Sequence, residues 1–260
     1  MELSSPHNTI LKSIRRAVSR GMAMDCGCVV AEGPHLLAEA LAPGSAWIVK
    51  RIFTTPAARL QHAALLESAE IEPTQVSARA FRSVASTETT QEILALLQPR
   101  KWSWPEVLKG SGVVVLLDAI QDPGNAGAIV RSAEAFGAAG LVFLQGCART
   151  TNGKLLRATA GSIFRLPFVE GIERAEALTR LDSDGRALYA LASNSGRPIS
   201  RANFRNRSSL AVGSEGHGIS EEILLRAEAV SVPTHRVESL NAAVACSIAL
   251  FEAARQRGLA

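Results

Sequence analysis

A buried-strand run that leads through a turn into a helix and then into a second strand is the feature that most constrains this fold. The apolar run lies at 113–120, the helix at 124–137 with Gly137 closing it, and the second strand at 141–144. Two strands joined by a helix pair in parallel, because a parallel pair needs a crossover connection. The sequence therefore predicts an α/β domain around a parallel sheet.

The same alternation continues to the carboxyl end. Further strands are predicted at 187–192, 209–213 and 229–233, each with a helix nearby. A helix with a broad apolar face and a basic end is predicted at 240–257. Strands that alternate with helices indicate a parallel sheet wrapped on both faces.

The first hundred residues show a smaller α/β pattern of one sheet covered by helices. It begins with an amphipathic helix at 9–20 whose basic side carries Lys12, Arg15, Arg16 and Arg20. Strands are predicted at 28–33 and 46–55, helices at 34–42, 58–69 and 78–85, and an extended segment at 71–77.

A linker is predicted between Gln98 and Gly112, where Pro, Gly and Trp residues follow no periodic face. We therefore expect two domains, at 1–105 and 106–260. Trp102 and Trp104 have two interpretations, stacking on nucleic-acid bases or packing against a domain.

Composition narrows the class of protein. Apolar residues make up 47% and charged residues 20% of the chain, which is too apolar for disorder. Apolar runs such as Val113–Leu117 fall far short of the roughly 18 residues that a membrane span requires. No signal-peptide pattern opens the chain, so we expect a cytoplasmic protein without membrane insertion. A formal charge of +4 permits an anionic partner without demanding one.

The four cysteines, Cys26, Cys28, Cys147 and Cys246, are expected to be reduced thiols. Cys26 and Cys28 lack the two-residue spacer of common zinc sites, and no histidine cluster accompanies them. We predict no metal and interpret this pair as small buried side chains at the start of a strand.

Three loops at predicted strand ends carry the candidate chemistry, since ligands of open α/β sheets bind outside the carboxyl ends of strands. The first holds the turn at 122–125, with Arg131 on the helix that follows. The second, at 213–220, is glycine-rich with a single carboxylate. The third, at 232–245, places two polar side chains at the entry to the last helix.

Common nucleotide and hydrolase motifs do not fit these loops. Neither GNAGA nor GSEGHG matches the G-x-G-x-x-G fingerprint, and no acidic residue follows at the spacing that a nicotinamide-dependent oxidoreductase needs. A Gly-Lys-Ser/Thr ending, which a P-loop requires, is absent, as is the G-x-S-x-G of serine hydrolases.

Taken together, the three loops resemble the SpoU family of tRNA and rRNA 2′-O-ribose methyltransferases, within the knotted SPOUT superfamily. The family's first motif is similar to Asp122–Ile129 with Arg131 and 135–137, the second to 213–218, and the third to 233–245. The amino-terminal stretches 8–41 and 86–91 are similar to the family's RNA-binding domain of ribosomal-protein-like α/β fold.

The resemblance implies transfer of a methyl group from S-adenosylmethionine to a ribose 2′-hydroxyl of RNA, with ribosomal RNA preferred. It also implies a homodimer and a deep trefoil knot, one of the rare exceptions to unthreaded connections. The catalytic residues it implies are Arg131, Asn125, Glu215, Ser239 and Asn241. The cofactor residues it implies are Gly213, Ser214, Glu215, Gly216, Val232, Leu240 and Ala242. We expect RNA contacts, but no DNA contacts, at Lys12, Arg15, Arg16, Arg20 and Arg157.

Alternatives stay open at this point. The target RNA is alternatively a tRNA, and the chain is alternatively an RNA-binding protein of the same fold without catalysis. Arg131 acts either as the base that takes the hydroxyl proton or as a clamp that binds a phosphate bidentately. The clamp is an alternative because guanidinium keeps its proton in proteins, which argues against the base role. Asn125 and Ser239 have the right chemistry to cap the helices that follow them.

Overall fold

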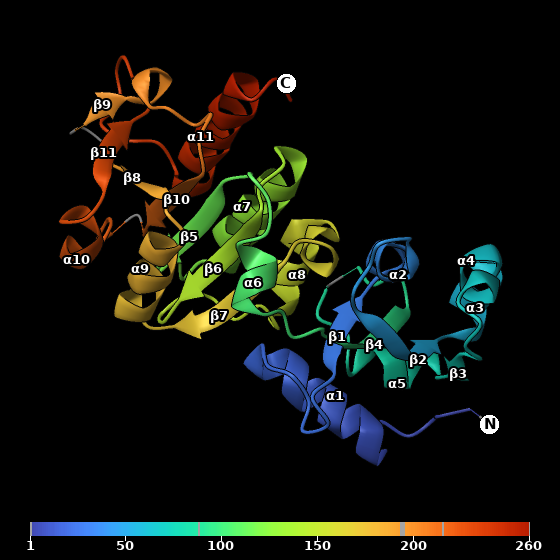
Figure 1. The fold of residues 1–260 in the computed structure, drawn as a ribbon. Helices are drawn as coiled ribbons and strands as arrows, with labels where there is room; N and C mark the ends of the chain where they lie inside the picture. The colour runs from blue at the N-terminus through green and yellow to red at the C-terminus, as the bar shows by residue number, and fades with distance from the viewer. Residues whose placement is uncertain (1, 88, 193–195, 215, 260) are drawn as a thin grey trace. The chain divides into compact units, whose positions relative to one another are not determined.

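The computed structural model describes residues 2–87, 89–192, 196–214 and 216–259. The chain forms two compact units (Figure 1). The first contains residues 1–100 and 149–165, and the second contains residues 101–148 and 166–260. The units are therefore not contiguous in sequence, whereas the domains expected at 1–105 and 106–260 are.

The first unit has a mixed four-stranded sheet, in its described residues, with the order β1-β4-β2-β3. Its strands are β1 (Val29–Glu32), β2 (Ile48–Thr54), β3 (Thr74–Gln75) and β4 (Ile93–Gln98). Its helices are α1 (Thr9–Arg20), α2 (Pro34–Leu41), α3 (Pro56–Gln61), α4 (Ala63–Ser68), α5 (Ala78–Arg82), α8 (Gly153–Thr159) and the short η1 (Ser162–Phe164).

Helix α1 forms where the sequence predicts it. The Asn8 side chain accepts a hydrogen bond from the Ile10 backbone N–H at the start, and Gly21 ends the helix in the left-handed conformation. Leu11 and Ile14 on its apolar side are fully buried against the sheet and α5. The amphipathic pattern thus decides which side of the helix meets the core.

The structure of this unit differs from the sequence analysis at two points, one wrong prediction and one missed strand. The single helix expected at 58–69 is two helices, because the chain departs from helical geometry at His62. Strand β4 was not predicted, although it lies between β1 and β2 in the sheet. All but its last residue are buried, so its sequence shows a continuous apolar run in place of an alternating pattern.

Residues 149–165 pack on the first unit through several contacts. The Phe164 ring lies 5.0 Å from the Trp47 ring, and its carbonyl accepts a 2.7 Å hydrogen bond from the Ala46 N–H. Arg165 forms a 2.6 Å ion pair with Glu39. These contacts hold residues 149–165 against α2 and the start of β2, although the two regions are far apart in the sequence.

The second unit has a seven-stranded sheet, over the described residues, with the order β7-β6-β5-β10-β8-β11-β9 and parallel pairing throughout. The strands are β5 (Val114–Asp118), β6 (Gly140–Leu144), β7 (Phe168–Ile172), β8 (Ala187–Leu191), β9 (Arg197–Pro198), β10 (Ser208–Gly213) and β11 (Glu228–Ser231). The helices are α6 (Trp104–Val107), α7 (Pro123–Ala135), α9 (Arg174–Ser183), η2 (Ile199–Arg201), α10 (Glu221–Leu224) and α11 (Ala242–Gln256). This arrangement confirms the predicted α/β fold with a parallel sheet.

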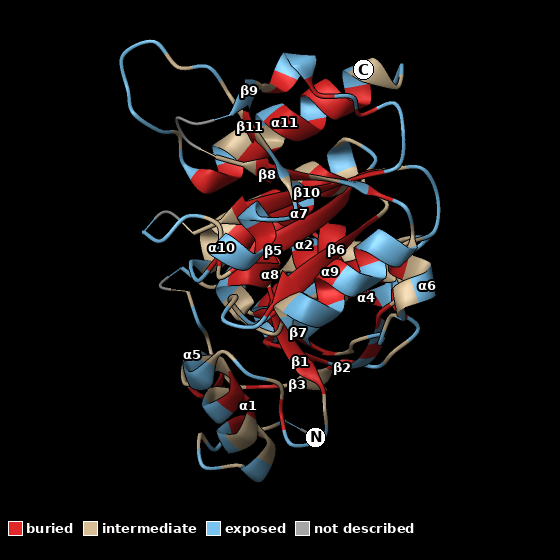
Figure 2. Cartoon of the chain, turned by 60° about the vertical axis from the view of Figure 1, so that its left-hand side comes forward, coloured by how far each residue is buried: buried red, intermediate tan, exposed pale blue. Residues whose placement is uncertain are grey.

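Helices cover both faces of this sheet. Val114 and Leu116 of β5 share one core cluster with Leu178 of α9 and Ile223 of α10. Helices α7 and α11 pack against each other and contact β6 and β10. Figure 2 shows the central strands buried, while α9 and α10 each keep an exposed side. In sheets covered in this way, ligands bind at the carboxyl ends of the strands, where the loops leave the sheet.

The predicted linker is more ordered than its sequence indicates. It contains α6, which begins with a capping box between Ser103 and Glu106. The Trp104 indole N–H donates a 3.0 Å hydrogen bond to Glu176, which favours the packing interpretation of this tryptophan. The buried Arg186 guanidinium donates to the carbonyls of Leu108, Gly110, Gly112 and Ser208 and to the Asp184 carboxylate. Arg186 thus holds the end of the linker against the second unit.

The cysteines match their prediction in part. All four are free thiols; Cys28 is buried as expected, but Cys26 is exposed, so its predicted burial is wrong. None of the described helices is long and apolar enough to cross a bilayer. Over residues 2–87, 89–192, 196–214 and 216–259, no cluster of three or more metal-ligating side chains occurs.

Candidate functional site

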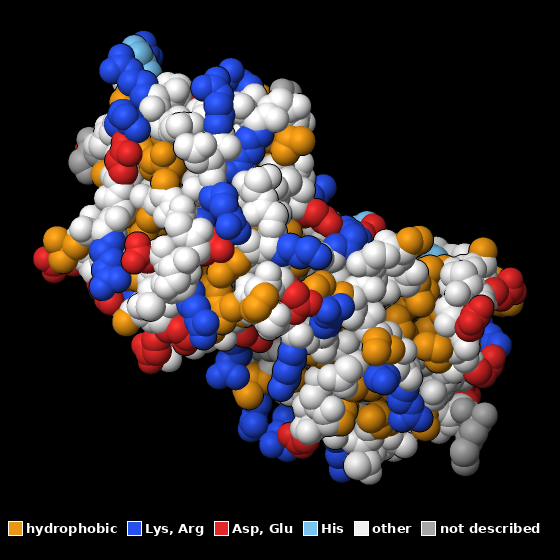
Figure 3. All heavy atoms as spheres, viewed as in Figure 1, with side chains coloured by type: hydrophobic (Ala, Val, Ile, Leu, Met, Phe, Trp, Pro, Cys, Tyr) orange, Lys and Arg blue, Asp and Glu red, His pale blue; other side chains and the backbone are white. Residues whose placement is uncertain are grey.

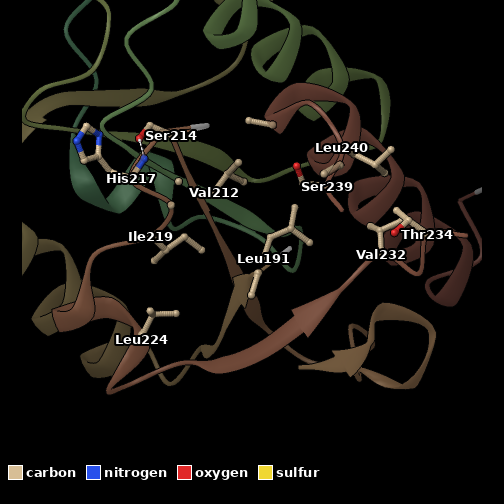
Figure 4. A pocket seen from close by; sticks show the side chains of 15 residues that line it. Leu191, Val212, Ser214, His217, Ile219, Leu224, Val232, Thr234, Ser239 and Leu240 are labelled. Atoms are coloured by element: carbon tan, nitrogen blue, oxygen red, sulfur yellow. Dashed lines mark hydrogen bonds between the residues drawn. The ribbon is translucent and has the colours of Figure 1, made fainter. Parts of the chain in front are cut away.

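A cavity of about 350 Å³ lies at the carboxyl ends of β8, β10 and β11 in the second unit (Figure 4). Apolar side chains from several elements form much of its wall: Leu191, Val212, Ile219, Leu224, Val232 and Leu240. Polar side chains also line it: Ser214, His217, Thr234 and Ser239. The cavity is therefore apolar enough for a flat heterocycle and has polar groups at several points to orient one.

The loop after β10 folds back on itself so closely that it needs glycine. A Cβ atom on Gly213 would lie 2.1 Å from the Gly218 carbonyl oxygen. The Gly218 N–H donates a 2.8 Å hydrogen bond to the Ser214 carbonyl, and Gly218 is left-handed with φ +67°. The loop therefore brings its backbone close to the cavity at Gly213 and Gly218, alongside the side chains of Ser214, His217 and Ile219. Glu215 lies outside the described residues.

Asp118, which the sequence reasoning missed, joins this loop to the sheet. It ends β5, and its side chain is 2% exposed. One carboxylate oxygen accepts a 2.7 Å hydrogen bond from the Ser220 N–H, and the other a 3.1 Å bond from Arg174 Nε. An acidic residue at the end of an apolar strand was the available signal.

The turn before α7 differs from its predicted capping. Asp122, not Asn125, caps the helix, because the Asp122 side chain accepts a 2.8 Å hydrogen bond from the Asn125 backbone N–H. The Asn125 side chain bonds across to the third motif instead. Its Oδ1 accepts a 3.0 Å hydrogen bond from Asn241 Nδ2.

The start of α11 also differs from the prediction. Asn241, not Ser239, caps this helix, because Asn241 Oδ1 accepts hydrogen bonds from the Ala243 and Val244 N–H groups. Its amide nitrogen points the other way and donates to Asn125. Two residues that the first and third motifs supply, 116 positions apart, therefore meet beside the cavity.

Two family models match parts of this chain. A family model described as "SpoU rRNA Methylase family" matches residues 112–251. This chain belongs to that family. A second model, "MRM3-like substrate binding domain", matches residues 8–95. The two matched ranges together contain the three motif loops and the basic helix α1.

Individual relatives agree with the SpoU family assignment. The 23S rRNA (guanosine(2553)-2′-O)-methyltransferase RlmP of Bacillus subtilis is 32% identical over 253 residues, which cover 96% of this chain and 98% of that protein. The 23S rRNA (guanosine-2′-O-)-methyltransferase RlmB of Xanthomonas campestris is 34% identical over 58% of this chain and 62% of its own length. The AdoMet-bound rRNA methyltransferase from Sinorhizobium meliloti superposes with a TM-score of 0.84, at 25% identity, over 98% of this chain and 97% of that one.

The seven cofactor residues that the resemblance to the SpoU family implies fall into three groups. Five line the cavity: Gly213, Ser214, Val232, Leu240 and Ala242. Gly216 is exposed and is not among the lining residues, and Glu215 is outside the described residues. Leu191 and Ala192 also line the cavity, but the sequence did not lead us to predict them as cofactor residues. Their position at the end of the predicted strand at 187–192 was the available signal.

Of the predicted catalytic residues other than the asparagine pair, Arg131 and Ser239 belong to the first and third motifs, and Glu215 lies outside the described residues. Ser239 is exposed and lines the cavity just before α11. Arg131 is an exposed residue of α7 beyond Asn125. Helix α7 is held to α11 by a 2.6 Å hydrogen bond between the hydroxyls of Ser132 and Ser247.

The predicted RNA-binding residues lie in the first unit. Figure 3 shows Lys and Arg side chains gathered over α1, where Lys12, Arg16 and Arg20 are exposed. Arg15 differs, because its guanidinium donates to the Ser83 carbonyl and hydroxyl and to the Pro6 carbonyl. Arg157 on α8 donates a 2.9 Å hydrogen bond to the Ser86 hydroxyl. Arg15 and Arg157 therefore also brace this unit.

Proposed function

We propose that this chain methylates a ribose 2′-hydroxyl of 23S ribosomal RNA with S-adenosylmethionine. The hydrogen bond between Asn125 and Asn241, at the rim of a cavity that the second and third motif loops line, is the observation that carries the proposal. A match of 32% identity over almost the whole chain to a 23S rRNA 2′-O-methyltransferase supports the same reaction and RNA class.

The cavity residues fit S-adenosylmethionine. Apolar side chains from the ends of β8, β10 and β11 suit an adenine face, and the glycine turn exposes backbone donors and acceptors for its edge. None of the described lining residues is a phosphate-binding lysine or arginine, which suits a nucleoside without phosphates. When bound, this cofactor supplies a methyl group on a positively charged sulfur.

The reaction forms a bond between the ribose 2′-oxygen and the methyl carbon and breaks the bond from that carbon to sulfur, which keeps the electron pair. The hydroxyl proton leaves to solvent water, and the demethylated cofactor, now a neutral thioether, is the other product. We assign Arg131 to binding the neighbouring RNA phosphate bidentately, because a guanidinium is a poor base and a good phosphate clamp. Positioning the hydroxyl in this way lowers the entropic part of the barrier.

The first unit is proposed to supply RNA affinity through the exposed basic residues of α1. Lys12, Arg16 and Arg20 are placed to neutralise backbone phosphates, and the substrate-binding family model covers this helix. We propose that RNA binding belongs to the expected domain 1–105 together with residues 149–165, and methyl transfer to the rest of the expected domain 106–260. Because ribosomal RNA is cytoplasmic, we propose a cytoplasmic location for the protein.

A homodimer is proposed through α11. Val244, Ile248 and Phe251 are exposed along one stripe of this helix, at spacings of four and three residues. A contiguous apolar stripe on a helix surface marks an interaction site. An isologous contact between two copies covers the stripe on both.

The deep trefoil knot is proposed with the dimer. Helix α11 follows β11 directly, yet it packs on α7, which follows β5. Strands β8 and β10 lie between β11 and β5, so the chain has to return across the carboxyl edge of the sheet. Such a return is the path that a threaded carboxyl-terminal segment takes.

Purified full-length protein incubated with labelled S-adenosylmethionine and total RNA from a strain lacking its gene tests this function. Label is expected in 23S rRNA, at a single ribose resistant to alkaline cleavage. Label in tRNA would favour the tRNA alternative. Tight RNA binding without cofactor binding or transfer would favour the non-catalytic alternative.

A further inference from the structure

Asp118 occupies a special position in the second unit. It ends β5, and in the parallel ladder it pairs with Gly213, the last residue of β10. Gly213 is also the residue at which the chain leaves the sheet to form the cavity loop. Asp118 therefore lies beside the point where that loop begins.

In addition to this backbone pairing, the Asp118 side chain holds the point where the loop ends. Its carboxylate accepts a 2.7 Å hydrogen bond from the Ser220 N–H, just after Ile219 has contributed to the cavity wall. Both ends of the loop from Gly213 to Ser220 are thus fixed on one residue. A buried carboxylate that accepts a backbone N–H makes a strong charge-assisted hydrogen bond.

A second loop starts from the same residue. Ala119 has φ +55°, a left-handed conformation that is uncommon without a glycine. This sharp turn directs the chain out of β5 towards Asp122 and Asn125. Strain at such a residue persists only where the surrounding structure fixes it, and Ala119 directly follows the bonded, buried Asp118.

Arg174 supplies the remaining charge partner. Its Nε donates to the other Asp118 oxygen at 3.1 Å, but its side chain is 41% exposed. The guanidinium neutralises a carboxylate that would otherwise be costly to bury. It does not line the cavity, so its effect on the cavity loop passes through Asp118.

We propose that Asp118 is a positioning residue that sets the shape of the Gly213–Ser220 loop for cofactor binding. This inference rests on the proposed function for the identity of the cofactor. A purely structural role for Asp118 in the ion pair with Arg174 is the competing explanation, and the two predict different effects at Ser220.

Substitutions at Ser220 isolate the hydrogen bond. Ser220 has φ −60°, a value that proline adopts, so Ser220→Pro removes the N–H donor while the Ser220 carbonyl still accepts from Ile223 and Leu224. Ser220→Ala is the matched control, because it keeps the N–H and deletes a hydroxyl that makes no hydrogen bond to the described part of the chain. Asp118→Ala, Asp118→Asn and Arg174→Met complete the set.

Calorimetric titration of the full-length variants with S-adenosylmethionine measures cofactor affinity. We expect Ser220→Pro and Asp118→Ala to raise the Kd at least about tenfold, the equivalent of one lost charge-assisted hydrogen bond. Ser220→Ala and Arg174→Met should stay within about threefold of the wild type. Asp118→Asn should fall between, since its amide oxygen still accepts from Ser220. In turnover, KM for the cofactor should rise more than kcat falls.

Three results decide against the inference. Equal weakening by Arg174→Met and Asp118→Ala would assign the effect to the ion pair. Wild-type affinity in Ser220→Pro, with melting confirming a folded protein, would show that the bond does not shape the site. Equal weakening by Ser220→Ala would show that the hydroxyl, rather than the N–H, matters. A wild-type protein that fails to bind the cofactor rejects the proposed function instead.

Discussion

At the scale of single residues, one side chain of the site makes hydrogen bonds with two different roles. Asn241 uses its amide oxygen to cap α11 and its amide nitrogen to bind Asn125. A residue can be essential to the helix and to the reaction at once, so a simple alanine substitution mixes the two effects. Substitutions that keep the cap and delete only the bond between the asparagines separate them.

The asparagine pair gives the first prediction. Asn125→Ala removes the acceptor but keeps the backbone N–H that Asp122 binds, and Asn241→Ser keeps a capping oxygen that is too short to reach Asn125. Both should leave the free energy of unfolding within about 0.5 kcal/mol and lower single-turnover methyl transfer. The double variant should be no slower than the slower single one; additive losses would mean that the two residues act independently.

Arg131 gives the second prediction. Arg131→Ala should abolish methyl transfer while the Kd for S-adenosylmethionine stays unchanged, because the arginine is assigned to the RNA phosphate. Arg131→Lys keeps the charge but loses the bidentate fork, so it should cost roughly 2 to 4 kcal/mol in transition-state stabilisation at every pH. Single-turnover rates across pH provide the measurement. Activity of the lysine variant that rises with pH would assign the base role instead.

At the scale of helices and strands, elements with a clear hydrophobic periodicity could be predicted from the sequence. Features that depend on tertiary contacts could not. Helix α1 follows from its amphipathic spacing and caps, and the strand–helix–strand unit from Val113 onward follows from its apolar runs. Strand β4 was missed although its apolar run resembles that of β5, because such a run does not by itself distinguish a buried strand from a buried helix. The role of Asp118 depends on β5 and β10 being neighbours, which no local pattern encodes.

A buried carboxylate at the end of β1 gives the third prediction. Burial alone would raise the pKa of Glu32, but hydrogen bonds from Ser86, Thr87 and Thr90 outweigh it and hold the pKa below its ordinary value of 4.5. The folded protein therefore binds fewer protons here than the unfolded chain, and this stabilisation is lost as the pH falls through the folded-state pKa.

Glu32→Gln should consequently lower the free energy of unfolding by about 1 to 3 kcal/mol near neutral pH and by less near about pH 4. Urea unfolding at both pH values measures the difference. Glu67→Gln, at an exposed position of α4, is the control and should show neither loss. A loss for Glu32→Gln that grows on acidification would mean that the folded state raises, rather than lowers, the pKa of this carboxyl.

At the scale of the whole molecule, the two units divide the work that the proposed reaction requires. The second unit holds the cavity and the asparagine pair, and the first carries the exposed basic residues of α1. Residues 149–165 belong to the first unit although the SpoU family model spans them. Periodicity cannot reveal this, because the assignment follows from contacts such as Trp47 with Phe164.

The dimer gives the fourth prediction. Ile248→Glu places a charge in the middle of the exposed apolar stripe of α11, where an interface would have to bury it. Sedimentation velocity at micromolar concentration should show a dimer for the wild type and a monomer for this variant. Leu60→Glu, an equally drastic change at an exposed leucine of α3, should leave the dimer intact. A wild-type monomer that is fully active would reject the interface.

RNA affinity gives the last prediction. Each lysine or arginine that neutralises a phosphate releases counterions, so log K falls with log salt by about 0.7 per contact on a single strand and by about 0.9 on B-form DNA. Alanine at Lys12, Arg16 and Arg20 should weaken binding of the 23S rRNA fragment that carries the mapped ribose and reduce this slope by about two units or more. Affinity for S-adenosylmethionine should stay constant, since these residues lie in the other unit from the cavity. Arg79→Ala removes one exposed arginine that belongs to α5 rather than to the basic side of α1, and it should leave the slope unchanged. An unaltered slope in the triple variant would mean that the basic side of α1 is only solvated, and that the RNA contacts of this protein lie elsewhere.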